Sequence, residues 1–284
     1  MFGVCAADTD GRRVRGVLVV GAGVTIRLDP FWRFYGGKHR AARRYPAPLH
    51  GRPIIEPFAG AAGYSTSWWE PGQRVILVER DPVVAAVWRY LLSASSAEIL
   101  RLPNVREHVD VDLAGCPQEA RWLAGFWLNE GGATPRKACT GWARARGDGG
   151  SIDCPSSWAG WGARARNRIA RQVDAVRGTW AIIEGDYTAA PMVDATWFID
   201  PPYQTSAGRY YKYATVDYAA LGAWCDTLPG RVVACDQEGA DWRPWTSRIC
   251  LGATSRANRP NKVSREVVWA RDNSRMPLFD GIGP

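Results

Sequence analysis

Short runs of β-branched and aromatic residues recur along this chain, and most of them end at an acidic residue or a proline. Such runs predict strands that are buried in a sheet. We expect strands over residues 54–56, 74–78, 180–183, 195–199, 231–234 and 267–270. Helical patterns over residues 64–69 and 83–92 follow the first two strands. Strands that alternate with helices in this way predict an α/β fold.

The alternation stops between residues 93 and 178, where glycines and arginines punctuate a polar segment. We interpret residues 93–178 as an insert in a catalytic domain made of residues 31–92 and 179–284, after an N-terminal extension of residues 1–30. The clearest element of the insert is a helix predicted over residues 162–177. Its apolar and basic residues fall on different faces: Ile169, Val173 and Val176 on one, and Arg164, Arg168 and Arg171 on another. The basic face is either a solvated surface or a surface that binds phosphates.

The N-terminal extension contains Gly21-Ala22-Gly23, which resembles the start of a dinucleotide-binding fingerprint. Ile26 occupies the place of the third glycine, and no helical pattern follows before Pro30. The pattern therefore predicts a short strand or a poorly ordered extension rather than a nucleotide-binding turn.

Composition and charge narrow the class of protein. The net charge of +8 and the pI near 9.3 suggest a polyanionic partner. Residues 136–177 hold nine Lys or Arg and three Asp or Glu, together with several of the fifteen tryptophans. The seven cysteines are scattered without a C-x-x-C pair, so we expect free thiols and no metal site. Because there is neither a long apolar run nor a signal-peptide layout, we expect a cytoplasmic protein with no membrane partner.

The strand predicted over residues 195–199 ends in Asp200-Pro201-Pro202-Tyr203. Two successive prolines cannot continue a strand, because they lack N–H donors and have a fixed φ. The carboxylate of Asp200 is then held at the carboxyl end of a strand, where open α/β sheets bind ligands. An acid, a rigid carbonyl and the ring of Tyr203 suit a planar, amino-bearing substrate such as a nucleobase. On its own, the tetrad could also be a strand-ending turn with a helix-capping aspartate.

Two turns and an acid earlier in the chain also point to a ligand. The glycine pair in the segment from Phe34 to Lys38 allows a tight turn close to a ligand, and Lys38 can reach an anion. Small residues from Pro57 to Gly63 let a ligand approach the backbone and place a helix N-terminus beneath it. Glu79, at the end of the second strand, is well placed to bind ribose hydroxyls.

In their order and spacing, these motifs resemble those of the Dam-type DNA adenine-N6 methyltransferases, with an insert like that of phage-encoded members. The resemblance covers most of residues 31–270, and it rests on Phe34 to Lys38, Glu56 to Gly63, Glu79, Gly185-Asp186-Tyr187 and Asp200 to Tyr203. It implies a Rossmann-like seven-stranded sheet with S-adenosylmethionine as cofactor and an inserted helical DNA-recognition region. The chain departs from the family at Phe34, where tryptophan is common, at Glu79, where aspartate is common, and in its N-terminal extension.

Site residues follow from this resemblance and from the charge pattern. The cofactor contacts implied by the resemblance are Phe34, Tyr35, Gly36, Gly37, Lys38, Glu56, Pro57, Phe58, Ala59, Gly60, Gly63, Glu79, Arg80, Asp186, Tyr187 and Asp200. Among these, Glu79 would bind the ribose hydroxyls and Asp186 the adenine amino group. Methyl transfer would take place at Asp200, Pro201, Pro202 and Tyr203. Double-stranded DNA is expected to contact Arg136, Lys137, Arg144, Arg164, Arg168, Arg171, Arg209 and Lys212.

The expected reaction methylates the amino group of an adenine that is flipped out of the duplex. Asp200 and the Pro201 carbonyl would accept the amino N–H bonds, and Tyr203 would stack on the base. Aspartate before Pro-Pro-Tyr favours adenine, while cytosine-N4, adenine in RNA and a glutamine amide remain open as acceptors. The sequence also leaves open a nonenzymatic DNA-binding relative and a nicotinamide oxidoreductase built on Gly21-Ala22-Gly23. We expect a monomer that protects phage DNA from restriction.

Overall fold

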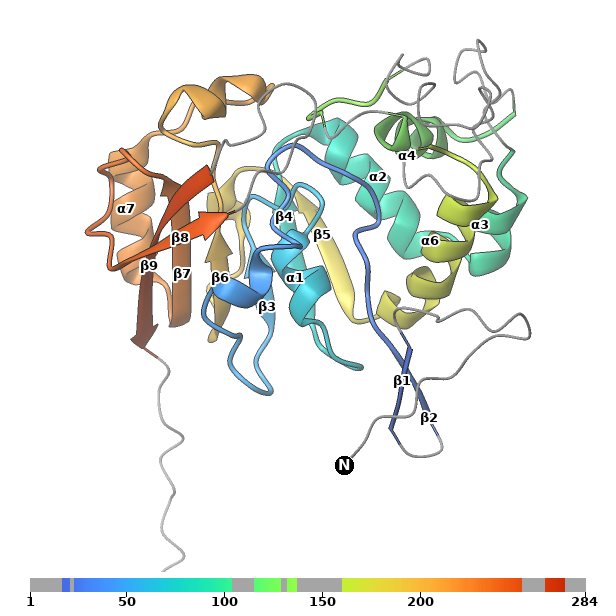
Figure 1. Ribbon diagram of the computed structural model, residues 1–284, viewed down its shortest axis with the longest axis horizontal. Helices are drawn as coiled ribbons and strands as arrows, with labels where there is room; N and C mark the ends of the chain where they lie inside the picture. The colour runs from blue at the N-terminus through green and yellow to red at the C-terminus, as the bar shows by residue number, and fades with distance from the viewer. Residues whose placement is uncertain are drawn as a thin grey trace, which may run out of the picture. The chain divides into compact units, whose positions relative to one another are not determined.

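The computed structural model describes residues 17–20, 23–103, 115–128, 132–136, 160–251 and 264–273. A seven-stranded sheet has the strand order β5-β4-β3-β6-β7-β9-β8 (Figure 1). Its strands are β3 (Ile54–Glu56), β4 (Val75–Glu79), β5 (Trp180–Glu184), β6 (Ala195–Ile199), β7 (Gly230–Gln237), β8 (Ser247–Leu251) and β9 (Ser264–Asn273). β3 is parallel to β4 and β6, and β6 to β7, whereas β9 is antiparallel to β7 and β8. The predicted Rossmann-like α/β fold is therefore confirmed.

The strand order reverses its direction between β3 and β6. The chain moves outwards from β3 through β4 to β5 on one side, and then from β6 to β7 on the other. Ligands of open α/β sheets bind outside the carboxyl ends of the strands at such a reversal. Glu56 ends β3 and Asp200 directly follows β6, so two predicted site residues lie at this point.

The strands beside the reversal are apolar along nearly their whole length, as expected for parallel strands that are covered on both faces. Every residue of β3 and β6 is buried. Trp197 of β6 packs edge-on against Trp224 of α7 (Tyr218–Thr227), with 5.7 Å between ring centroids. Its indole N–H is also satisfied, because it donates to the Pro229 carbonyl at 2.7 Å. These contacts fix the position of β6, the strand that leads into the tetrad.

Contacts between Cα atoms divide the chain into two compact units. The first unit comprises Met1–Arg40, Gly60–Gln73 and Ala86–Ala181, and the second comprises Ala41–Ala59, Arg74–Ala85 and Ile182–Pro284. The carboxyl ends of β3, β4, β6 and β7 belong to the second unit, which also contains the 3₁₀-helices η1 (Ala42–Arg44), η3 (Tyr187–Ala189) and η4 (Ser206–Tyr210). The predicted division into a catalytic domain and an inserted DNA-recognition region is defined by function, so it stays a prediction.

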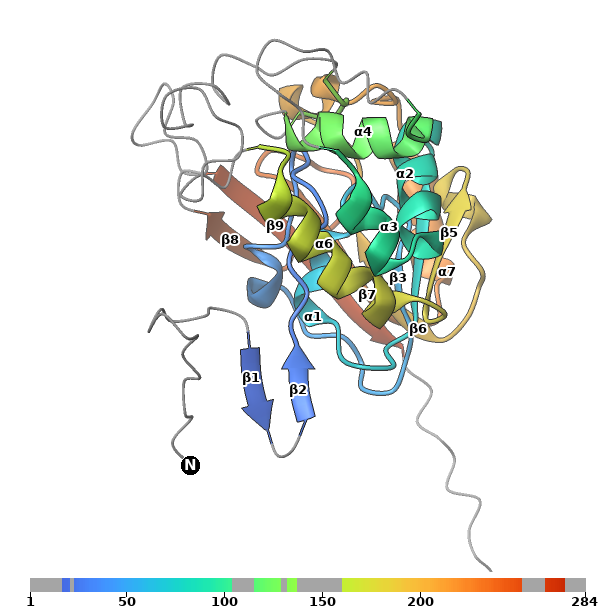
Figure 2. The ribbon, with the colours of Figure 1, turned by 90° about the vertical axis from the view of Figure 1, so that its right-hand side faces the viewer.

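The first unit is mainly helical over its described residues. Its elements are β1 (Val17–Val20), β2 (Gly23–Ile26), α1 (Gly63–Trp68), most of α2 (Pro82–Ser93), α3 (Ser96–Arg101), α4 (Gln118–Trp127) and α6 (Ala163–Val176). α3 and α6 lie side by side (Figure 2). β1 pairs antiparallel with β2, so the short strand predicted in the N-terminal extension is confirmed. No helix in the described segments has the length and apolar character that a membrane span requires.

Tryptophan contributes much of the interior of the first unit. Trp32 and Trp88 are both buried, with 4.8 Å between their ring centroids, and Phe126 stacks on Trp32 at 5.6 Å. Trp161, which the sequence places in the basic block, is fully buried and donates its indole N–H to the Pro103 carbonyl at 2.9 Å. Trp161 therefore belongs to the core and is not a surface on which a base could stack.

Candidate active site

Polar residues from distant parts of the sequence meet at the carboxyl edge of the sheet in the second unit. β4, β3, β6 and β7 are successive neighbours, so Glu79, Glu56, Asp200 and Asp236 follow one another along this edge. Glu56 and Asp236 are buried, whereas Asp200 and Glu79 are partly accessible. Such a row of acids favours ligands that donate hydrogen bonds.

The Asp200 side chain is oriented by a residue of the neighbouring strand. Cys235 of β7 is fully buried, and its Sγ lies 3.3 Å from Asp200 Oδ1. An ionised carboxylate can only accept, so the thiol is the donor. The sequence offers no sign of this contact, because it arises from the parallel register that pairs Ile199 with Ala234. Cys235 is therefore a residue of the site that the sequence analysis missed.

Tyr203 is fixed at its hydroxyl end. Its O–H donates to Glu266 Oε1 at 2.6 Å, and Glu266 is a buried residue of β9. Burial, together with the nearby groups of Asp200, Cys235 and Glu266, raises the pKa of Tyr203 well above its usual value. The hydroxyl therefore keeps its proton at neutral pH and acts as a donor.

The backbone that carries the tetrad is held from several sides. The Tyr218 hydroxyl donates to the Pro202 carbonyl. A Cβ added to Gly208 of η4 would lie 2.0 Å from the Tyr203 carbonyl oxygen, so only glycine allows η4 to approach this closely. The buried carboxylate of Asp236 accepts the Gln204 N–H at 3.2 Å, just after the tetrad. These contacts fix the position of the turn as well as the acid in it.

The predicted cofactor residues of the second unit lie at the ends of β4 and β5. The Gly185 N–H donates to the Glu79 carbonyl at 2.9 Å, so Glu79 and Asp186 occupy adjacent strand ends. The Asp81 N–H donates to Glu79 Oε1 at 2.9 Å and orients that carboxylate. Asp186 and Arg80 are both exposed and form an ion pair at 3.7 Å, which is worth little in water.

Aromatic rings and a buried turn complete this part of the second unit. The rings of Phe58 and Tyr187 stack with centroids 5.5 Å apart and planes 28° apart. Burial, followed by the charges of Asp186 and Asp217, raises the pKa of Tyr187. Pro57 and Ala59, on either side of Phe58, are buried, and the Ala59 N–H donates to the Val78 carbonyl at 3.0 Å. The turn after β3 is thereby tied to β4.

The first unit holds the remaining predicted cofactor residues. Gly36 has φ +69°, and Lys38 is buried and donates from Nζ to the Gly36 carbonyl at 3.0 Å, so this lysine closes its own turn. A Cβ added to Gly63 would lie 2.6 Å from the backbone nitrogen of His39, and one added to Gly60 would lie 3.0 Å from the Phe34 ring. The structure thus brings together two motifs, Phe34 to Lys38 and Gly60 to Gly63, that the sequence shows only as separate turns. Tyr35 is half-buried and Gly37 is exposed in the same turn.

The predicted DNA-binding residues have different environments. Arg164 and Arg171 are exposed on α6, and Arg136, Arg209 and Lys212 are exposed as well. Arg168 forms an ion pair with Asp29 at 3.6 Å and lies 5.5 Å from the centroid of the Trp127 ring, and burial lowers its pKa. The charge of Arg168 is therefore engaged inside the first unit. Lys137 and Arg144 lie outside the described residues.

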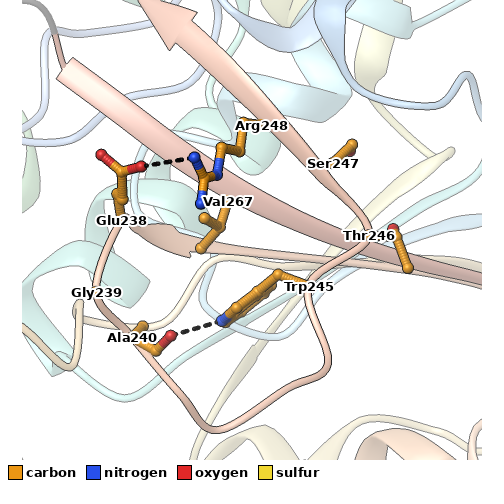
Figure 3. A pocket seen from close by; sticks show the side chains of 8 residues that line it. All are labelled: Glu238, Gly239, Ala240, Trp245, Thr246, Ser247, Arg248 and Val267. Carbon is orange, nitrogen blue, oxygen red and sulfur yellow. Dashed lines mark hydrogen bonds and ion pairs between the residues drawn. The ribbon is translucent and has the colours of Figure 1, made fainter.

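An open pocket of about 580 Å³ lies beside the end of β7 and the start of β8 (Figure 3). It is lined by Glu238, Gly239, Ala240, Trp245, Thr246, Ser247, Arg248 and Val267. The Trp245 indole donates to the Ala240 carbonyl at 2.8 Å, and Glu238 pairs with Arg248 at 3.3 Å (Figure 3). None of these eight residues is among the predicted site residues.

Comparisons with known proteins add little to this geometry. No family model matches the chain, and no curated protein matches it. Matches among solved structures include a conserved hypothetical protein from Streptococcus pyogenes, with 10% identity, a TM-score of 0.34, and coverage of 80% of this chain and 91% of that one. They also include HI0767 from Haemophilus influenzae, described as a proposed methylase, with 11% identity, a TM-score of 0.29, and coverage of 80% and 89%. At these identities and TM-scores, the likenesses carry no argument about activity.

Proposed function

We propose that this protein is a DNA methyltransferase that transfers a methyl group from S-adenosylmethionine to the N6 amino group of adenine. The observation that carries the proposal is the position of Asp200-Pro201-Pro202-Tyr203 at the reversal of the strand order, outside the carboxyl end of β6. That is the place where Rossmann-like sheets bind their ligands. The resemblance to Dam-type enzymes gives this position its chemistry.

The cofactor fits the side chains at the ends of β4 and β5 in the second unit. The carboxylate of Glu79 suits the two hydroxyls of a ribose, and the exposed carboxylate of Asp186 suits an adenine amino group, because both accept hydrogen bonds. Phe58 and Tyr187 add apolar rings beside them. When bound, S-adenosylmethionine supplies a methyl group made electrophilic by a sulfonium.

The tetrad would act on the methyl acceptor by positioning and electrostatics. The adenine amino group is a weak nucleophile, because its lone pair is delocalised into the ring. The carboxylate of Asp200 and the carbonyl of Pro201 would each accept one amino N–H, which localises the lone pair on nitrogen. The amino nitrogen would then form a bond to the methyl carbon while the bond from that carbon to the sulfonium sulfur breaks and leaves a thioether, and one amino proton would leave to solvent. Cys235 and Glu266 hold Asp200 and Tyr203, so little reorganisation is needed.

Nucleic acid as the substrate is supported by charge and accessibility. The protein carries a net charge of +8. Exposed basic side chains occur on α6, at Arg164 and Arg171, and in the loop after the tetrad, at Arg209 and Lys212. Such side chains contact phosphates without reading sequence. A base must leave the duplex to reach Asp200, at a cost of a few kcal/mol.

The proposal is tested by incubating the full chain with S-adenosylmethionine, labelled at its methyl group, and an unmodified duplex. Nucleosides from the digested DNA are then analysed by mass spectrometry. The expected product is labelled N6-methyldeoxyadenosine. Label in N4-methyldeoxycytidine, or label found only in parallel incubations with RNA or protein, would establish a different acceptor. No transfer to any acceptor would reject the enzymatic assignment.

A further inference from the structure

We propose that Glu266 is a positioning residue that fixes the ring of Tyr203 for stacking on the substrate base. The inference deepens the proposed function and rests on it. Glu266 lies on β9, and 63 residues of the chain separate it from Tyr203. None of the motifs in the sequence includes it.

The carboxylate of Glu266 links two tyrosines. Its Oε1 accepts the Tyr203 hydroxyl at 2.6 Å, and its Oε2 accepts the Tyr45 hydroxyl. Glu266 is only 4% exposed and Tyr45 only 3%. We call Tyr45, Glu266 and Tyr203 the tyrosine clamp.

Because Glu266 is buried, its carboxylate depends on the two tyrosine hydroxyls for hydrogen bonds. A buried carboxylate is stable only when hydrogen-bond donors replace water, and here a hydroxyl serves each oxygen. The raised pKa of Tyr203 keeps its hydroxyl protonated, so the donor is present at every physiological pH. If Glu266 is removed, both hydroxyls lose a strong acceptor, and the Tyr203 ring gains freedom to rotate about its side-chain bonds.

The clamp is connected to the strand that carries the acid. The Tyr45 ring packs edge-on against Phe198 of β6, with centroids 5.2 Å apart, and Phe198 precedes Asp200 by two residues. Glu266 itself is fixed by its register opposite Gln237 of β7. Tyr203 is therefore positioned relative to Asp200 through side chains as well as through the intervening prolines. A stacking ring in a fixed place lowers the entropic cost of holding a flipped base.

Four variants separate positioning from mere stability. Glu266→Ala removes the acceptor, Glu266→Gln keeps its shape and one acceptor oxygen, and Tyr203→Phe removes the donor while keeping the ring. Asp272→Ala is the matched control, because Asp272 lies at the other end of β9, where its carboxylate accepts from Arg231 at 2.6 Å. The variants with conserved shape leave no large cavity, so they remain informative if Glu266→Ala does not fold.

The first measurement is the single-turnover rate of methyl transfer to a duplex, with saturating protein and S-adenosylmethionine. We expect Glu266→Ala and Tyr203→Phe each to lower the rate about tenfold, and the double variant to be no slower than either one, because both remove one interaction. Glu266→Gln should stay within about threefold of the wild type. Asp272→Ala, which removes a carboxylate from the same strand, should leave the rate unchanged. An unchanged rate in Glu266→Ala, or multiplied effects in the double variant, would overturn the proposal.

The second measurement needs neither substrate nor cofactor. In protein labelled with 3-fluorotyrosine, the Tyr203 resonance is assigned by its loss in Tyr203→Phe. It should shift and broaden in Glu266→Ala, and should stay in place in Asp272→Ala. A wild type that methylates no nucleic acid would reject the proposed function and, with it, a role of the clamp in stacking. The fluorine spectrum would still decide whether Glu266 fixes the ring, and an unchanged Tyr203 resonance in Glu266→Ala would show that it does not.

Discussion

Gly208 of η4 offers a sharp test of how closely the loop after the tetrad must pack. A Cβ at this position would lie 2.0 Å from the Tyr203 carbonyl oxygen and 2.9 Å from both its carbonyl carbon and its nitrogen. All three are backbone atoms, so no side-chain rotation can relieve the overlap. Either η4 or the tetrad must move in Gly208→Ala. Overpacking of this kind costs about 1–3 kcal/mol, and contacts with backbone belong at the upper end.

We expect Gly208→Ala to lower the melting temperature by about 6–12 °C, which corresponds to about 3 kcal/mol at roughly 2–4 °C per kcal/mol. Its effect on methyl transfer should be larger, because a displacement of about 1 Å in a positioning group costs about a hundredfold in rate. The assay is the single-turnover rate beside a thermal melt.

Gly239→Ala is the control for this experiment. Gly239 has φ +103° and no atom within 4 Å of an added Cβ, so alanine there introduces backbone strain without a clash. This variant should lose about 1–2 kcal/mol of stability and keep the wild-type rate. If Gly208→Ala transfers methyl groups as fast as Gly239→Ala does, then the tight packing of η4 against Tyr203 has no part in the reaction.

Two further predictions concern charge. On α6, Arg171→Ala should weaken DNA binding and reduce its salt dependence by about one released counterion without changing the melting temperature. Arg168→Ala should lower the melting temperature and leave DNA binding nearly unchanged, because Arg168 contacts Asp29 and Trp127. Equal losses of DNA affinity in the two variants, measured by fluorescence anisotropy, would contradict this distinction. At alkaline pH, burial, aided by Asp236, raises the pKa of Tyr218 from 10.0 to about 12, so the folded state keeps a proton that the unfolded chain releases. This contribution to the free energy of unfolding is complete below pH 10 and is lost as the pH rises towards 12; Tyr218→Phe should flatten that decline in urea titrations, and an unchanged slope would contradict the assignment.

Much of the sheet could be predicted from the sequence, because buried parallel strands are nearly continuous apolar runs. β3 and β6 were recognised in this way, together with the acid and prolines after β6. β8 was missed, since it is short and its Arg248 and Cys250 are exposed, so only its pairing with β9 defines it. α7 was missed although Asp217 caps it by accepting the Ala220 N–H at 2.9 Å. Asp217 was the signal that could have located this helix.

Only those residues of the candidate site that belong to local sequence motifs could be predicted. The tetrad and Glu79 stand out as acids that end strands. Cys235 and Glu266 do not, because their contacts with Asp200 and Tyr203 span 35 and 63 residues and depend on strand register. The hydrogen bond from Lys38 to the Gly36 carbonyl could not be predicted either, because the sequence suggested only that this lysine reaches an anion.

Asp200 is the residue on which the proposed reaction depends most. The decisive measurement compares wild type with Asp200→Ala for the formation of N6-methyldeoxyadenosine in duplex DNA, by mass spectrometry of labelled nucleosides. Binding of S-adenosylmethionine is measured on both proteins by calorimetry. We expect the wild type to methylate adenine, and we expect Asp200→Ala to bind the cofactor but to lose at least about a hundredfold in rate. An Asp200→Ala variant that methylates adenine as fast as the wild type would contradict the proposed role of Asp200.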